Sequence, residues 1–273
     1  MKNKRQVRAK TSGSETTSGV FNPAVTPPIS CFNLAETDLG LPLTKLIAAM
    51  QTCVDKHVAP VWGTPAKLIE STGFVKKAWA MVFLDDADEA GALAYHDLTP
   101  EGLPLAKVFV RTTLEAGESV SVSASHELVE MLVDPAINMY ANGPDLQPLY
   151  AYTGSEPVQA VSLDIFGYAA MYAYESADPV EEETFKVDGV EMSDFVYPAY
   201  FEDFHEPGST QFDHLKKLKR PYQILPGGYQ IIFVNGQFTN VFTSKAKEKR
   251  FAKEDRRGHR SEARKRGELL RAR

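Results

Sequence analysis

The residues between 125 and 135 combine metal-binding side chains with a helical pattern. The stretch reads Ser-His-Glu-Leu-Val-Glu-Met-Leu-Val-Asp-Pro. At about 100° per residue, an α-helix places His126, Glu127, Glu130 and Asp134 on one face and surrounds them with large apolar residues. A surface helix has the opposite proportion of polar to apolar surface. We therefore expect a buried helix whose narrow polar face lines a cleft.

The spacing of these polar residues favours a metal site. Buried carboxylates need compensating partners, and a divalent cation is an effective one. His126 and Glu130 are four residues apart, like the two histidines of an HExxH zinc-binding helix, with Glu in place of the second His. Glu127 lies beside the metal-binding residue in sequence, which suits a general base that takes a proton from water. The alternative is a capped helix whose polar residues pair with one another.

A third protein ligand has to come from another part of the chain, because a catalytic zinc needs three ligands and an open position. Glu175 and Asp178 follow an apolar segment and precede a proline. We place Glu175 ahead of Asp178 as the third ligand, and Asp134 after both. The alternative for Glu175 and Asp178 is a solvated acidic loop, since three more glutamates follow. Such a carboxylate-rich ligand set would also suit manganese or calcium, and it would weaken the activation of bound water.

His96 is a further catalytic candidate. It follows an apolar segment in the sequence Ala-Tyr-His-Asp, and we expect it at the end of a strand, where it could bind a metal or hold an oxyanion. The alternative is a histidine that makes only local hydrogen bonds in a turn. The chain has no glycine-rich phosphate loop, and the serines near His126 lack the turn that presents a nucleophilic serine.

Length and composition limit the classes of protein that remain. A chain of 273 residues can bury one substantial core. No run of 18 apolar residues occurs, so we expect no membrane span. The basic N-terminus is followed by Ser, Thr and Gly without an apolar segment, which excludes a typical secretory signal there. Cys31 and Cys53 could form at most one disulfide and no four-sulfur zinc site, which favours a reducing compartment.

Charge divides the chain into three parts. Its net charge is −6, but residues 244–273 contain 13 Lys and Arg against 5 Asp and Glu, and residues 1–20 are also basic. The part between them is therefore strongly acidic. We expect a flexible lead-in over 1–28, a folded domain over 29–243 and a basic tail over 244–273. The tail could contact nucleic acid or an acidic assembly.

The order of the expected elements indicates an α+β domain with a mixed sheet over the metal-binding helix. Hydrophobic periodicity and turn residues predict the elements, and Ser123 or Ser125 would cap the metal-binding helix. The expected elements are a helix at 42–59, a turn at 60–65, strands at 78–84, 92–95, 107–112, 160–164 and 169–174, and hairpins at Asp188-Gly189 and Asn235-Gly236.

Four segments together resemble the zincin-like metallopeptidases of the HExxE type that phages and prophages encode. The segments are 59–63, 92–97, 125–135 and 174–180. The HExxE motif, followed by Asp-Pro and a later Glu-x-x-Asp, is also similar to secreted proteins with a zincin-like core. The resemblance covers roughly residues 40–235.

The resemblance implies a zincin-like fold and a role for each motif. His126 and Glu130 match the metal ligands, Glu127 the general base, and Glu175 and Asp178 the downstream acidic motif. It implies one zinc ion and hydrolysis of a peptide or protein, in the cytoplasm of a bacterial host or in a virion. The alternative is a non-catalytic phage structural or nucleic-acid-associated protein that keeps this fold.

Overall fold

A computed structural model describes residues 26–89, 92–142, 171–173, 175–201, 211–234 and 237–243. Both basic ends, the strand expected at 160–164 and the turn residues Asn235 and Gly236 lie outside this part of the chain.

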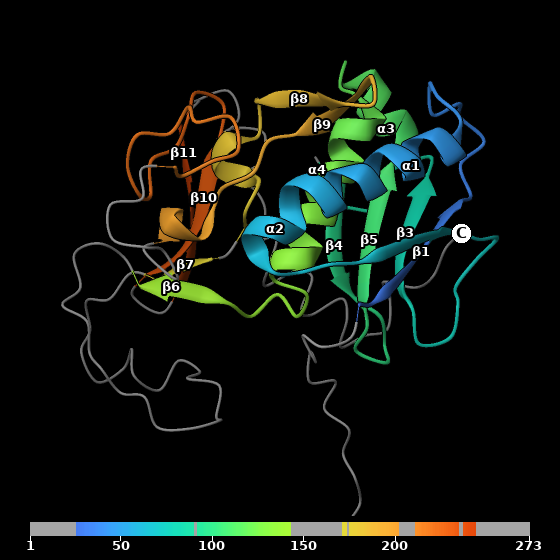
Figure 1. The fold of residues 1–273 in the computed structure, drawn as a ribbon, viewed down its shortest axis with the longest axis horizontal. Helices are drawn as coiled ribbons and strands as arrows, with labels where there is room; N and C mark the ends of the chain where they lie inside the picture. The colour runs from blue at the N-terminus through green and yellow to red at the C-terminus, as the bar shows by residue number, and fades with distance from the viewer. Residues whose placement is uncertain are drawn as a thin grey trace, which may run out of the picture.

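A mixed sheet of five strands forms one layer of the molecule (Figure 1). Its strands are β1 (Pro28–Asn33), β2 (Lys67–Glu70), β3 (Trp79–Leu84), β4 (Ala94–Leu98) and β5 (Pro104–Phe109). They lie in the order β2-β1-β3-β5-β4. The first four of that order are parallel to their neighbours, whereas β4 at the edge is antiparallel to β5. The expected mixed sheet is thus confirmed, in a fold that is mixed α/β.

Two helices cover one face of this sheet (Figure 1). They are α1 (Leu43–Cys53) and α4 (Val120–Val133). Alternate strand residues point to opposite faces, and those on the helix side share the main core with both helices, among them Cys31, Met81, Phe83 and Val108. The opposite face has a smaller apolar cluster that includes Phe32, Val82 and Leu105. The core therefore fixes α4 against the sheet.

The structure differs from the sequence-based expectation at several element boundaries. The helix expected to end at 59 continues through a π-helical turn, Val54–Val58, and through α2 (Ala59–Trp62). The helix ends at Gly63, which has a φ of 69°. Glycine adopts this left-handed conformation without the strain that a side chain would cause. The Trp62 indole donates a hydrogen bond of 3.0 Å to the carbonyl of Val196, a contact that no local pattern reveals. Residues 60–62, which the sequence assigned to a turn at 60–65, therefore belong to helix α2.

The region of the expected strand at 107–112 is divided between two elements. β5 ends at Phe109, and α3 (Val110–Glu115) begins directly after it. The sequence does not predict the parallel strands β1 and β2, because both pair with chain that is distant in sequence. The end of β5 and the presence of β1 and β2 therefore depend on tertiary contacts that the local sequence pattern does not specify.

The C-terminal half forms a second, antiparallel sheet and a separate hairpin. The sheet contains β6 (Tyr140–Asn142), β7 (Met171–Ala173), β10 (Tyr229–Val234) and β11 (Gln237–Phe242), in the order β11-β10-β7-β6. The hairpin joins β8 (Thr184–Val187) and β9 (Val190–Ser193). Asp188 and Gly189 have φ values of 51° and 79°, as expected for a tight hairpin turn. The hairpin packs against α4 and α1.

The sequence left a disulfide between Cys31 and Cys53 possible and predicted no membrane span. Cys31 and Cys53 are both buried and unbridged, and burial raises the pKa of each thiol to about 12. They are therefore inert apolar core residues. None of the helices in the described ranges has the length and apolar character needed to cross a bilayer.

Candidate metal centre

Helix α4 is buried on nearly every side, as its sequence predicts. Every residue from Glu127 to Val133 is buried. The predicted N-cap is wrong, however, because the helix begins at Val120 after Ser119. Ser125 lies inside the helix, and its hydroxyl accepts a hydrogen bond of 2.8 Å from the Ser193 amide at the end of β9. Ser125 therefore contacts the hairpin and does not cap the helix.

His96 lies within β4 and not at a strand end followed by a turn. The strand runs from Ala94 to Leu98, and a turn with Gly102 at φ 79° connects it to β5. Ala94 belongs to the same core as α4, whereas Tyr95 packs on the other face of the sheet. Because side chains alternate along a strand, His96 shares the face of Ala94. The edge strand therefore presents His96 to the polar face of α4.

His96 faces two carboxylates of the HExxE motif. Its Nδ1 lies 3.3 Å from Oε2 of Glu127 and 3.5 Å from Oε2 of Glu130. The His96 side chain is fully buried. Burial by itself would lower the pKa of His96, but hydrogen bonds with Glu127 and Glu130 and the charge of Glu175 outweigh it and raise the pKa to about 10. Without a bound cation, these contacts favour the imidazolium form of His96, whose Nδ1 lies against Glu127.

His126 stands at the centre of a second set of contacts. Its Nε2 lies 3.3 Å from Oε1 of Glu130 and 3.3 Å from Oδ1 of Asp178. The exposed fraction of the side chain is 13% for His126 but only 6% for Glu130 and 3% for Asp178. Solvent therefore reaches this group from the side of His126.

His126, Glu130 and Asp178 shift one another's pKa values. Burial opposes charge on His126, but the charge of Glu130 and hydrogen bonds with Asp178 and Glu130 raise its pKa well above the usual value. Burial would raise the pKa of Glu130, but the charge of His126 and its hydrogen bonds hold that pKa well below the usual range. Burial and the charge of Glu130 raise the pKa of Asp178 to about 7. A cation bound here would have to displace these protons.

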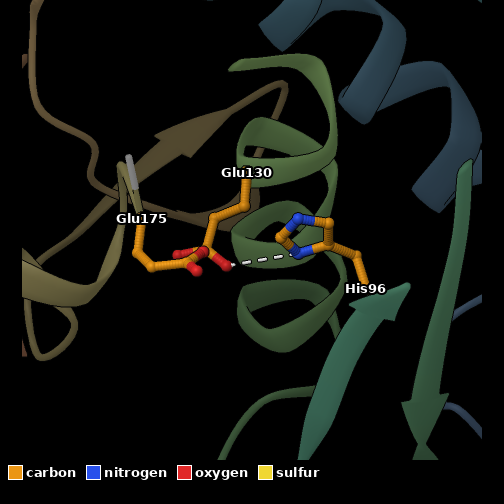
Figure 2. A group of neighbouring side chains, drawn as sticks. All are labelled: His96, Glu130 and Glu175. Atoms are coloured by element: carbon orange, nitrogen blue, oxygen red, sulfur yellow. Dashed lines mark ion pairs between the residues drawn. The ribbon is translucent and has the colours of Figure 1, made fainter. Parts of the chain in front are cut away.

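The donor atoms form two groups that could each hold a metal ion. His126, Glu130 and Asp178 form one, and His96, Glu130 and Glu175 form the other; within each group the ligand atoms lie within 4.8 Å of one another. Figure 2 shows His96 and Glu175 approaching Glu130 from β4 and from the segment after β7. Only Glu130 belongs to both groups among the described residues.

The geometry of the first group fits a divalent cation. Tetrahedral coordination with bonds of about 2.0–2.1 Å puts neighbouring ligand atoms about 3.3 Å apart. The two contacts of His126 Nε2 have that length. Oε1 of Glu130 is buried, and apart from its 3.3 Å contact with His126 it accepts no hydrogen bond within the described part of the chain. An imidazole with two carboxylates is a donor set for zinc or manganese.

The structure brings most of the expected site residues together, but in another pairing. Asp178 contacts His126, whereas Glu175 joins His96 and Glu130 in the other group. Asp134 belongs to neither group. Its two carboxylate oxygens each accept a hydrogen bond of 3.0 Å, from the amides of Asn138 and Met139, at the end of α4. This contact gives Asp134 a structural role in ending the helix.

A glycine fixes the position of Asp178. The residue begins the 3₁₀ turn η2 (Asp178–Val180), and the Leu225 amide donates a hydrogen bond of 3.0 Å to the carbonyl of Pro179. A Cβ atom built on Gly228 would lie 2.4 Å from that carbonyl oxygen and 2.9 Å from the carbonyl oxygen of Asp178. Only glycine therefore permits the chain before β10 to approach this turn so closely.

Gly228→Ala is expected to displace η2 and thereby the carboxylate of Asp178. The clash involves backbone atoms, so it cannot be relieved by rotation of a side chain. We expect a loss of about 1–3 kcal/mol in the free energy of unfolding, together with weaker binding of a divalent cation, measured by chemical denaturation and by metal titration. Gly73→Ala is the control, since a Cβ there would meet nothing within 4 Å. Equal behaviour of the two variants would contradict this role of Gly228.

Comparison with known proteins finds no matching family model, no matching curated protein and no matching solved structure. The function therefore has to be argued from the site.

Proposed function

We propose that this protein is a metal-dependent hydrolase of peptide bonds, with zinc held by His126, Glu130 and Asp178. The observation that carries the proposal is the pair of 3.3 Å contacts from His126 Nε2 to Glu130 and Asp178, beside a carboxylate that belongs to neither group of metal donors, Glu127. When bound, the cation would lower the pKa of a water molecule and polarise the substrate carbonyl.

The position of the site in the fold supports a zincin-like arrangement. The HExxE helix α4 packs under a mixed sheet, next to its antiparallel edge strand β4. This is the arrangement that the sequence resemblance implies. A fold by itself does not establish an activity, so the proposal depends on the side chains of the site.

Glu127 acts as the general base in this proposal. Its carboxylate takes a proton from the attacking water while the water oxygen adds to the carbonyl carbon. The same carboxyl group then delivers that proton to the amide nitrogen, the C–N bond breaks, and an acid and an amine leave. As long as His96 binds no cation itself, it is a positioning residue, since its Nδ1 lies 3.3 Å from Oε2 of Glu127 and orients that carboxylate.

The first test is the metal content of the purified full-length protein, measured by plasma mass spectrometry beside the variant His126→Ala. We expect at least one zinc ion per chain in the wild type. The variant should lose the ion bound by His126. The wild type should cleave peptides of a library, and a chelator should abolish this cleavage. No metal in the purified protein, together with no uptake of added zinc, would overturn the proposal. It would favour the non-catalytic alternative.

A further inference from the structure

We propose that the site holds two divalent cations, with the carboxylate of Glu130 bridging them. The second cation would be bound by His96, Glu130 and Glu175. This inference rests on the proposed function for the first cation at His126, Glu130 and Asp178, and it adds a second metal position with its own ligands.

The orientation of the Glu130 carboxylate supports the bridge. Oε1 lies 3.3 Å from Nε2 of His126, whereas Oε2 lies 3.5 Å from Nδ1 of His96. The two oxygens of one carboxylate therefore face two different imidazoles. Hydrolases with paired metals hold their ions about 3.5–4 Å apart, where the pair stabilises both the attacking and the leaving oxygen. A carboxylate that offers one oxygen to each ion is a suitable bridge at this separation.

One segment supplies the remaining ligand of each position. Glu175 and Asp178 are three residues apart and lie before and at the start of η2, and both are buried. Asp178 reaches the group of His126, and Glu175 reaches the group of His96. Figure 2 shows Glu130 between Glu175 and His96 in front of α4. Each position thus receives one imidazole and one carboxylate of its own, besides the shared Glu130.

The charges within this cluster balance with two cations. Its carboxylates are Glu127, Glu130, Glu175 and Asp178, and all of them are buried. With both imidazoles neutral as ligands, two divalent ions match the charge of four ionised carboxylates. With a single ion at His126 and a protonated His96, one negative charge remains in a buried site. Uncompensated charge of this kind is costly in a protein interior. The carboxylate-rich donors suit manganese as well as zinc.

The test is a titration of the metal-free full-length protein with Mn²⁺, counting bound ions after equilibrium dialysis. We expect two ions per chain in the wild type and an electron paramagnetic resonance signal of a coupled pair. Glu175→Gln and His96→Ala should each bind one ion, with the signal of isolated Mn²⁺. His57→Ala is the matched control and should bind two, because its ring packs on Phe185 and His214, outside the cluster.

The outcomes separate this inference from the proposed function. One ion in the wild type would overturn the pair while leaving a single-metal hydrolase intact. Two ions in both Glu175→Gln and His96→Ala would also overturn it, since the second ion would then lie elsewhere. No ion in Glu175→Gln with a native circular dichroism spectrum would show that the two positions are not separable and would overturn it as well. No ion in the wild type would overturn both proposals.

Discussion

Glu127→Gln is expected to lower kcat by about 100- to 10,000-fold, the usual contribution of a general base. The amide has nearly the same shape as the carboxylate but cannot accept a proton from water. Glu127 is buried and belongs to neither group of metal donors, so the metal content should stay at the wild-type value. The measurement combines steady-state kinetics on a cleaved peptide with metal analysis of the same preparation.

Glu118→Gln is the matched control for this prediction. It makes the same chemical change at an exposed position that precedes α4, so its kcat should equal that of the wild type. If Glu127→Gln retains full turnover, Glu127 is not the base and the proposed mechanism is wrong. If the variant loses metal together with activity, Glu127 is a ligand instead, and the assignment of donors must change.

The second large effect is on stability, at a pair of buried carboxyl groups outside the metal centre. Asp194 and Asp213 are both fully buried. Burial raises the pKa of Asp194, and the neighbouring carboxylate of Asp213 raises it further, to about 8. The backbone hydrogen bonds from Phe195 and Leu215 act in the opposite direction. The folded protein therefore keeps a proton on Asp194 at neutral pH.

This proton makes stability depend on pH in a defined direction. Between the ordinary pKa of an aspartate and about 8, the folded state binds one proton more than the unfolded state at Asp194. The stabilisation is complete below this window and decreases as pH rises through it, by up to about 1.4 kcal/mol per pH unit. Asp194→Asn should abolish this contribution and make the protein more stable than the wild type at pH 8.5, because an amide never loses a proton there.

Urea denaturation at pH 5, 6.5 and 8.5 measures the effect as the difference between variant and wild type, which removes the contributions of other titrating groups. The asparagine oxygen can still accept the hydrogen bonds from Phe195 and Leu215, at 2.8 and 3.3 Å in the native protein. Asp188→Asn is the control, since it removes an exposed charge from a turn position that asparagine tolerates. A pH profile of Asp194→Asn parallel to that of the wild type would refute the prediction.

The sequence by itself determined the features that depend on neighbouring residues. The spacing of His126, Glu127 and Glu130 predicts one helical face, and the apolar residues between them predict a buried helix, because the period of an α-helix is fixed. The turn at Asp188-Gly189 is equally local, since both residues must adopt positive φ, which few residue types tolerate. The buried helix and the hairpin both form, although the helix begins at Val120, before the expected cap.

Only the tertiary structure decided which acidic residue meets which histidine. Glu175 and Asp178 have the same chemistry and lie three residues apart, so ranking Glu175 first from the sequence had no physical constraint behind it, and it is Asp178 that contacts His126. The 3₁₀ turn and its close approach to Gly228 direct Asp178 to His126. His96 reaches the site because its strand pairs with β5 at the sheet edge. Such contacts join residues that are distant in the chain, and their geometry is set by packing of the whole core rather than by local conformational preference.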